Sequence, residues 1–253
     1  MIKVCIIGGG NVGFHLAYQF IKTDQVQLVQ LYNRTISKIN PFENSVSITD
    51  DLNKLMEADV YIIATSDIAI HEISYQLPFS NRLVVHTSGS EGLLSLSNKN
   101  RRGVFYPLQS LSKSKPIDFS EIPICIEAEN EEDLVMLHAL ASALSSKVYD
   151  ISSEQRKYLH VSAVFVNNFV NHLYHIASQI CVKKEIPFEI LMPLIKETAD
   201  KINYLSPKLA QTGPAIRNDN TTIENHLKLL STKEKEIYQL LTSSIKDVYK
   251  TRK

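Results

Sequence analysis

The chain has 253 residues, of which 44% are hydrophobic, and its 27 basic residues balance its 27 acidic ones. This length and composition predict two domains of modest size. The balanced charge argues against binding to nucleic acid or to an anionic membrane surface. Cys5, Cys125 and Cys181 lie far apart without a CxxC pair, which argues against a zinc site and against disulfides, and no metal is expected.

The N-terminal residues 1–4 lead directly into an apolar run without the layout of a signal peptide. No later apolar stretch approaches the ~18 residues that span a bilayer. We therefore expect a cytoplasmic protein with reduced cysteines, no membrane partner and a small-molecule substrate.

The first half of the chain alternates short β-rich runs with helical stretches. Several runs are apolar at consecutive positions, as is typical of strands covered on both faces. The alternation predicts an α/β fold, a doubly wound and mostly parallel sheet of the Rossmann type. Strands are expected at Ile2–Ile7, Val26–Tyr32, Val46–Ile48, Val60–Thr65, Leu83–Thr87, Val104–Phe105, Ile124–Ile126 and Val148–Tyr149.

The second half has apolar residues at helical spacing, over residues 154–183 and 188–204. Pro193 is expected to bend or interrupt the second of these helices. Two further helices are expected to begin with capping boxes, at Thr221–Glu224 and at Ser231–Glu234. We therefore predict a dinucleotide-binding domain over residues 1–152 and an all-helical substrate or dimerisation domain over residues 153–253.

A glycine-rich turn follows the first predicted strand. Gly8, Gly10 and Gly13, with Asn11 and Val12 between the last two, satisfy the GxGxxG pattern between a strand and a helix. The first glycine permits the tight turn, the second lets the backbone approach a pyrophosphate, and the third allows the helix to pack on the strand. The alternative is a structural turn that binds nothing.

The end of the second strand indicates which dinucleotide is bound. Its residues are Asn33, Arg34 and Thr35, whereas an NAD-binding chain would place an acid there. A guanidinium suits the 2′-phosphate of NADP(H), and the flanking side chains supply neutral donors. The sequence therefore favours NADP(H) over NAD(H) and FAD. Alternatively, Arg34 stacks on the adenine or faces water.

Two later strand ends are also expected to border the cofactor, because ligands of such sheets lie beyond the carboxyl ends of the strands. They carry small hydroxyl residues and a glycine, which suit close passage of ribose and nicotinamide. The same residue types are common in ordinary turns. The candidates are Thr65, Ser66, Asp67, Ser88 and Gly89.

With these motifs together, the chain resembles a two-domain bacterial family that joins a Rossmann-like NADP-oxidoreductase domain to a helical domain of unknown function. It is more distantly similar to pyrroline-5-carboxylate reductase and to 3-hydroxyacid dehydrogenases. The resemblance implies NADP binding, a cleft between the domains and a homodimer formed through the helices. It rests on the glycine turn, Asn33–Thr35, His86–Gly89, Phe105–Ser110, His160–Asn168 and Thr212–Asp219.

The resemblance does not supply a mechanism. The helix that opens the second half lacks a clear counterpart of the lysine that 3-hydroxyacid dehydrogenases use as acid or base, since Lys157 is poorly placed for that role. His160 is instead the first candidate proton donor, and Asn168 lies at helical spacing from it. Both residue types also occur in helices for structural reasons.

Two further polar residues are candidates for substrate contacts. Gln109 follows Tyr106-Pro107-Leu108, and a proline-fixed backbone could direct its amide toward a ligand or let it cap a backbone group. Arg217 could bind a substrate carboxylate. Its alternatives are an internal pair with Asp219 or, for Asp219, a helix cap.

These features predict an NADP(H)-dependent oxidoreductase that passes hydride to or from a C=O or C=N carbon of a small substrate held between the domains. His160, Asn168 and Gln109 are its candidate catalytic residues, and Arg217 is its candidate substrate residue. The alternative is a non-catalytic NADP-binding or redox-sensing module, which would bind the cofactor without turnover.

Overall fold

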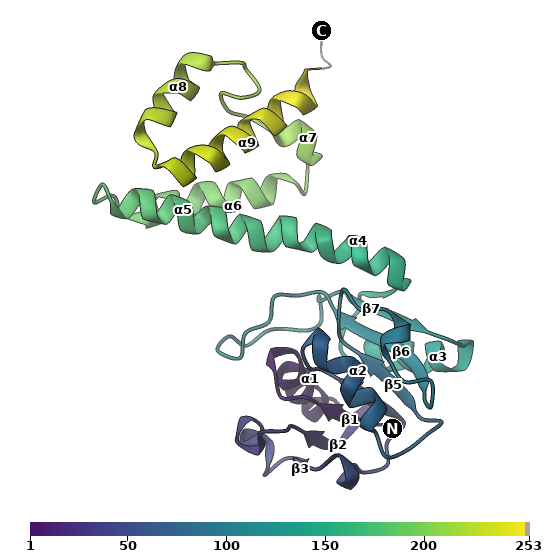
Figure 1. The fold of residues 1–253 in the computed structure, drawn as a ribbon. Helices are drawn as coiled ribbons and strands as arrows, with labels where there is room; N and C mark the ends of the chain where they lie inside the picture. The colour runs from purple at the N-terminus through teal and green to yellow at the C-terminus, as the bar shows by residue number, and fades with distance from the viewer. Residues whose placement is uncertain (251–253) are drawn as a thin grey trace. The chain divides into compact units, whose positions relative to one another are not determined.

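The computed structural model describes residues 1–250. The chain divides into two compact units, Met1–Asn167 and Asn168–Lys253, which are described separately here (Figure 1). The expected boundary between residues 152 and 153 is the point at which helix α4 (Ser153–Ala163) begins. The functional division of the chain stays a prediction. No helix within residues 1–250 combines the length and apolar character that a bilayer crossing requires.

The first unit is built on a single eight-stranded sheet with the order β3-β2-β1-β4-β5-β6-β7-β8. Neighbouring strands are parallel except for β6 and β7, which are antiparallel. The α/β class and the mostly parallel sheet are thus confirmed. The strands are β1 (Ile2–Ile7), β2 (Val26–Tyr32), β3 (Ser47–Thr49), β4 (Val60–Ile63), β5 (Leu83–His86), β6 (Arg101–Pro107), β7 (Ile124–Ala128) and β8 (Val148–Asp150).

The strand register brings the ends of four strands to one edge. Ile7 pairs with Ile63, Ile63 with His86, and His86 with Val104, so these residues form one row across β1, β4, β5 and β6. Residues that follow this row in sequence lie at the carboxyl edge of the sheet, where doubly wound folds bind their ligands.

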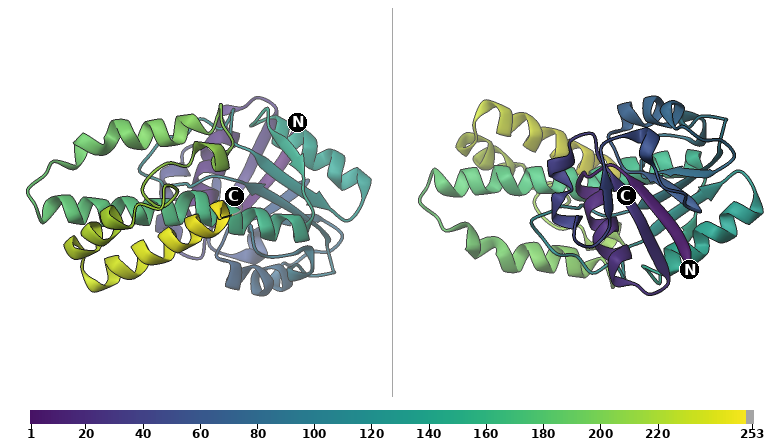
Figure 2. Two further views of the ribbon diagram at one scale, coloured as in Figure 1. Left: turned by 90° about the horizontal axis from the view of Figure 1, so that it is seen from above. Right: turned by 90° about the horizontal axis from the view of Figure 1, so that it is seen from below.

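Helices cover both faces of the sheet and enclose two apolar cores. α1 (Asn11–Lys22) and α3 (Glu131–Ser142) contribute Leu16, Phe20 and Leu137 to one core, and α2 (Asp67–Gln76) contributes Ile70 to the other. The views in Figure 2 show α2 and α3 on opposite sides of the strands. Alternate residues of β1 enter the two cores, which explains its uninterrupted apolar sequence.

Short 3-10 turns complete the loops of this unit. They are η1 (Ile36–Lys38), η2 (Asn40–Phe42), η3 (Leu52–Lys54) and η4 (Leu93–Ser95). α4 follows β8 and begins with a capping box. The Ser152 hydroxyl accepts from the backbone amide of Gln155, and the Gln155 side-chain oxygen accepts from the backbone amide of Ser152.

The helix predicted over residues 154–183 is interrupted by a π-helical segment. α4 passes into η5 (Val164–Phe169), a π-helix, and then into α5 (Val170–Val182). A π turn contains about one residue more than an α turn, so residues after 164 do not keep the α-helical spacing from His160 on which the common face with Asn168 was predicted.

The second unit is helical from α5 onward. α5 is followed by η6 (Phe188–Leu191), α6 (Met192–Lys201), α7 (Pro207–Ala210), α8 (Asn220–Leu229) and α9 (Thr232–Tyr249). Pro193 lies in the first turn of α6, so the predicted interruption falls between η6 and α6. Lys183 at the end of α5 donates to Glu234 at the start of α9 at 2.8 Å.

One of the two predicted capping boxes is confirmed. At α9 the Ser231 side chain and Glu234 form the reciprocal pair. The box predicted at Thr221–Glu224 is wrong, because the N-cap of α8 is Asp219, two residues before Thr221. The Asp219 carboxylate accepts from both the amide and the hydroxyl of Thr222, which is the helix-cap alternative stated for this residue. A carboxylate at this position satisfies one of the orphan amides at the start of the helix.

Candidate functional site

The glycine turn after β1 has the geometry expected of a phosphate cradle. Gly8 has a φ of +122°, and a Cβ there would lie 2.4 Å from the Ala64 carbonyl oxygen. At Gly13 a Cβ would lie 1.9 Å from the Gly8 carbonyl oxygen. These two glycines are therefore required by the fold itself, one for the turn and one for helix packing.

Gly10 differs from them because it has space around it. The nearest atom to a Cβ at this position is the Ala64 carbonyl oxygen at 3.8 Å. Gly10 is also the N-cap of α1, and the first turn of the helix, residues 11–14, contains only neutral side chains. The turn thus leaves backbone amides and a helix N-terminus open to an anion, which is the arrangement that a pyrophosphate requires.

A hollow of about 360 Å³ lies against this turn. It is adjoined by a second hollow of about 230 Å³, and the two share Gly8, Asn33, Thr65 and Ser66. The second hollow is lined by Arg34, Thr35 and Lys38 on one side and by residues of α2 on the other. Arg34 and Lys38 are exposed, so both cations are accessible to an anionic ligand.

Asn33 lines both hollows and makes two hydrogen bonds to the backbone around them, and its predicted contact with the cofactor stays a prediction. Its Oδ1 accepts from the Gly9 amide at 2.9 Å, and its Nδ2 donates to the Thr35 carbonyl oxygen at 2.8 Å. The side chain therefore joins the glycine turn to the end of β2 and shapes both hollows.

The loop after β5 is organised by its own side chains. The Ser88 hydroxyl accepts from the amides of Ser90 and Glu91, each at 3.1 Å. Asp67 at the start of α2 accepts from the Ser90 hydroxyl at 2.5 Å. Ser88 and Asp67 thus hold the loop in place through Ser90. Gly89, between Ser88 and Ser90 in sequence, faces two aromatic side chains.

These two side chains are Tyr106 and His160. The Tyr106 hydroxyl and His160 Nδ1 are 3.1 Å apart and hydrogen bonded. Both rings lie against Gly89, where a Cβ would be 2.5 Å from His160 Nδ1 and 2.9 Å from Tyr106 Cζ. An imidazole, a phenol and a backbone without a side chain therefore meet beyond the end of β5 and beside the last residues of β6.

Arg156, one turn before His160 on α4, holds this helix to the loop. The Arg156 side chain is fully buried and bonds Glu127 of β7 at 2.6 Å. It also donates to the carbonyl oxygens of Ser88 at 3.2 Å and Glu91 at 2.5 Å. The buried ion pair thus fixes the chain segments on both sides of Gly89.

The other sequence candidates lie elsewhere on the two units. Gln109 is exposed, and its Oε1 accepts from the Ser110 amide at 2.8 Å, which is the backbone-capping alternative. In the second unit, Asn168 lies in the π-helix and Arg217 precedes the N-cap of α8, and both are exposed. The roles predicted for these three residues stay predictions.

Sequence reasoning missed Lys38, Tyr106 as a partner of His160, and Arg156. Lys38 lies four residues beyond Arg34, and Arg156 lies four residues before His160, which is one turn on a helix. That spacing was a usable signal for Arg156. Tyr106 had none, because it meets His160 across 54 residues of sequence.

Across residues 1–250, His, Cys, Asp and Glu side chains do not gather in a group of three or more that could hold an ion. Burial raises the pKa of the Cys5 thiol to about 12.

Comparison with known families agrees with this geometry. Residues 3–89 match the family described as NADP oxidoreductase, coenzyme F420-dependent, and residues 122–245 match a domain of unknown function, DUF2520. A search of curated proteins gave no match.

Solved structures of similar fold cover the whole chain. A Thermotoga maritima protein is 19% identical and covers 98% of each chain with a TM-score of 0.74. A reductive aminase from Aspergillus terreus, solved with NADPH and ethyl-5-oxohexanoate, is 17% identical and has a TM-score of 0.73 over 100% of this chain and 95% of its own. At these identities the likeness establishes the fold.

A Bacteroides fragilis protein assigned as an NADP oxidoreductase is much more similar. It is 40% identical, with a TM-score of 0.88, and the match covers 97% of this chain and 98% of that one. The chain therefore belongs to the family of this protein, with an NADP oxidoreductase domain that precedes a domain of unknown function.

Proposed function

We propose that this protein is an NADP(H)-dependent oxidoreductase acting on a C=O or C=N carbon of a small molecule. The observation that carries the proposal is the shared position of two features at the carboxyl edge of the sheet. The glycine turn follows β1, and the Tyr106–His160 pair lies beyond the end of β5 and beside the last residues of β6. Strands are about 4.8 Å apart, so two or three inter-strand spacings place these features about 10–15 Å from each other.

The residues present fit the cofactor that the family implies. Amides at the start of α1 would bind the pyrophosphate at Gly10, where the space is open. Arg34 would bind the 2′-phosphate, with Thr35 and Lys38 beside it in the same hollow. Thr65 and Ser66 line both hollows and would border the nucleotide between them. Bound NADPH would supply the hydride.

His160 would supply the proton. It is half-buried beside Gly89, and Tyr106 engages its Nδ1, which leaves Nε2 as the second nitrogen of the ring. Hydride transfer to a carbonyl or imine carbon needs a group that gives a proton to the oxygen or nitrogen, and an imidazolium performs this near neutral pH. The similar folds of the reductive aminase and an imine reductase from Aspergillus terreus, both solved with the cofactor or a reduced form of it, support this substrate class.

A screen for NADPH oxidation tests the proposal. The full-length protein would be mixed with NADPH and panels of ketones, ketones with amines, and cyclic imines. We expect cofactor oxidation with at least one class, and a loss of at least tenfold in His160→Asn, since proton transfer contributes about 10²–10⁴-fold to such steps. Tight NADPH binding without oxidation across all classes would instead indicate a non-catalytic sensing module.

A homodimer formed through the helical unit is the second part of the proposal. Within residues 168–250, only Cys181, Ala215 and Ile223 are buried. Many large apolar side chains of this unit are exposed, and a monomer seldom leaves such surface to water. Exposed examples are Phe169, Val182, Ile190, Leu194, Ile202, Leu209, Leu229, Leu240 and Val248.

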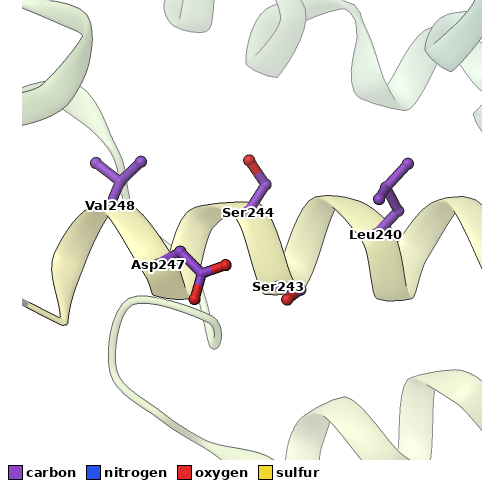
Figure 3. A pocket seen from close by; sticks show the side chains of 5 residues that line it. All are labelled: Leu240, Ser243, Ser244, Asp247 and Val248. Carbon is purple, nitrogen blue, oxygen red and sulfur yellow. The ribbon is translucent and has the colours of Figure 1, made fainter.

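Figure 3 shows one such surface, on α9. Leu240, Ser244 and Val248 project from the same side of the helix, and together with Ser243 and Asp247 they border a shallow hollow of about 500 Å³. A ridge of apolar and small residues at helical spacing is suited to packing against another helix. A second copy of the chain is the partner that we assign to it.

A further inference from the structure

The hydrogen bond between Tyr106 and His160 joins two elements that are far apart in sequence. Tyr106 lies near the end of β6, and His160 lies in the third turn of α4. Their ring centroids are 6.2 Å apart with the planes at 67°, an edge-on arrangement that directs the phenol hydroxyl at Nδ1. Nδ1 of His160 is thereby engaged by the Tyr106 side chain.

The surrounding backbone is built to permit this contact. Gly89 does not need a positive φ, so its lack of a side chain matters only for space. Any Cβ there would displace either the imidazole or the phenol. Gly92, three residues later in the same loop, provides a contrast, because a Cβ there would meet Ser153 Oγ at an ordinary 3.5 Å.

Burial of the Tyr106 ring favours the protonated phenol. Burial raises the pKa of Tyr106, with smaller contributions from Cys125 on β7 and Asp67 on α2 that raise it and from Arg156 on α4 that lowers it. Glu127 offsets the Arg156 charge through their ion pair. On β5, burial lowers the pKa of His86 to about 4, so that residue is neutral near pH 7.

A neutral phenol can accept a hydrogen bond from a protonated imidazole. Both nitrogens of an imidazolium carry hydrogen, so Nδ1–H would donate to the Tyr106 oxygen and Nε2–H would be the remaining donor. Arg156 and the capping box of α4 fix the backbone that carries the ring. The ring is therefore held at Nδ1, which leaves Nε2 as its second nitrogen.

We propose that Tyr106 is a positioning residue that fixes the His160 ring through Nδ1, so that Nε2 is the atom that exchanges a proton with the substrate. This inference rests on the proposed function. In the reductive direction the Nε2–H bond breaks and the proton binds the substrate oxygen or nitrogen, while His160 becomes neutral and keeps its hydrogen on Nδ1. The electron pair that reduces the substrate carbon comes from NADPH.

The first test reads the imidazole directly and needs no turnover. Nitrogen NMR of the full-length ¹⁵N-labelled protein would follow the side-chain signals of His160 across pH, with His160→Gln as the assignment variant. We expect the neutral ring to carry its hydrogen on Nδ1 in the wild type and to shift toward Nε2 in Tyr106→Phe. Unchanged His160 signals in Tyr106→Phe would overturn the assignment.

Tyr238→Phe is the matched control. It removes another phenol that bonds a histidine, because Tyr238 and His226 Nδ1 are 2.8 Å apart in the second unit. This variant should alter the signals of His226 and leave those of His160 unchanged. A change at His160 in both variants would show a general response to tyrosine loss and would overturn a specific role for Tyr106.

The second test uses the pH profile of kcat/KM for NADPH oxidation. An acid catalyst loses activity as the pH rises, and removal of the acceptor at Nδ1 disfavours the charged ring. The falling limb should therefore move to lower pH by about half to one unit in Tyr106→Phe. A limb that coincides with that of the wild type would overturn the positioning role, whereas absence of turnover in the wild type would refute the proposed function itself.

Discussion

Arg34 and Lys38 are the residues on which discrimination between the two nicotinamide cofactors would depend in the proposed function. They line the same hollow as Gly8 and Asn33 and are both exposed. A 2′-phosphate distinguishes NADPH from NADH, and a guanidinium binds phosphate through two parallel hydrogen bonds. Replacement of one cation should therefore affect the two cofactors unequally.

We predict that Arg34→Ala weakens NADPH binding about tenfold to a hundredfold, the equivalent of the ~1.5–3 kcal/mol of a charge-assisted hydrogen bond. NADH binding should stay within about twofold. Titration followed by cofactor fluorescence measures both constants, and Lys38→Ala should show a smaller loss of the same kind. Lys99→Ala, a change of another surface cation, serves as the control. Equal weakening of both cofactors would contradict a contact with the 2′-phosphate.

The residues of the glycine turn were predictable from the sequence, because their chemistry is local. Strand, turn and helix follow one another directly, and each glycine acts on atoms close to it in space. The role of Asn33 was not predictable, since a side-chain amide can face a ligand or the backbone with the same sequence. Tyr106 and Arg156 became visible only when the fold brought β6, β7 and α4 together.

At the level of elements, the sheet was predictable and its lateral order was not. Apolar runs marked β1 and β2 with their observed bounds. The short edge strand β3 lies one residue beyond its predicted place. β6 is longer than predicted, because it begins at Arg101, Arg102 and Gly103, which lack the apolar side chains on which the prediction was based. The antiparallel pairing of β6 and β7 depends on a loop, residues 108–123, that is long enough for either direction.

Helix periodicity likewise predicted where helices lie but not their internal form. The residues of the π-helix at Val164–Phe169 are types that also occur in α-helices, so the sequence does not distinguish the two forms. Such segments are frequent near functional sites. At α8 the cap moved to Asp219 because a carboxylate two residues earlier competes with the predicted Thr221 for the exposed amides.

The start of α4 is the element whose stability matters most for the proposed site. Arg156 is fully buried, and its partner Glu127 also binds the amide and hydroxyl of Ser153. We predict that Arg156→Met lowers the free energy of unfolding by about 3–5 kcal/mol. The reason is that the Glu127 carboxylate would stay largely buried without the cation that pairs with it. Urea unfolding would measure the change.

Arg102→Met is the comparison for this prediction. Arg102 pairs with Glu129 at the surface, where both side chains are partly exposed. Its loss should cost about 0–1 kcal/mol, since water replaces the partner. Similar losses in the two variants would contradict the assignment of Arg156 as the buried anchor of α4.

At the scale of the whole molecule, the exposed apolar side chains of the helical unit require a partner. We predict that light scattering gives a mass of twice 28.6 kDa for the wild type. Leu240→Asp should lower this mass at micromolar concentrations, because a charge in an apolar interface is poorly solvated. Leu94→Asp, which changes an exposed leucine in the first unit, should leave the dimer intact. A wild-type mass of 28.6 kDa at all concentrations would contradict the dimer.

The central claim is that this protein transfers hydride from NADPH to a small substrate. NADPH carrying deuterium at carbon 4 of the nicotinamide tests it most directly, with each stereochemical form supplied separately together with a ketone or cyclic imine. Mass spectrometry would then detect deuterium on the carbon that was reduced. We predict one deuterium in the product from one form of the cofactor and none from the other. NADPH that binds in both forms but gives no labelled product in any case would contradict the oxidoreductase assignment, and binding without any product would favour a sensing role.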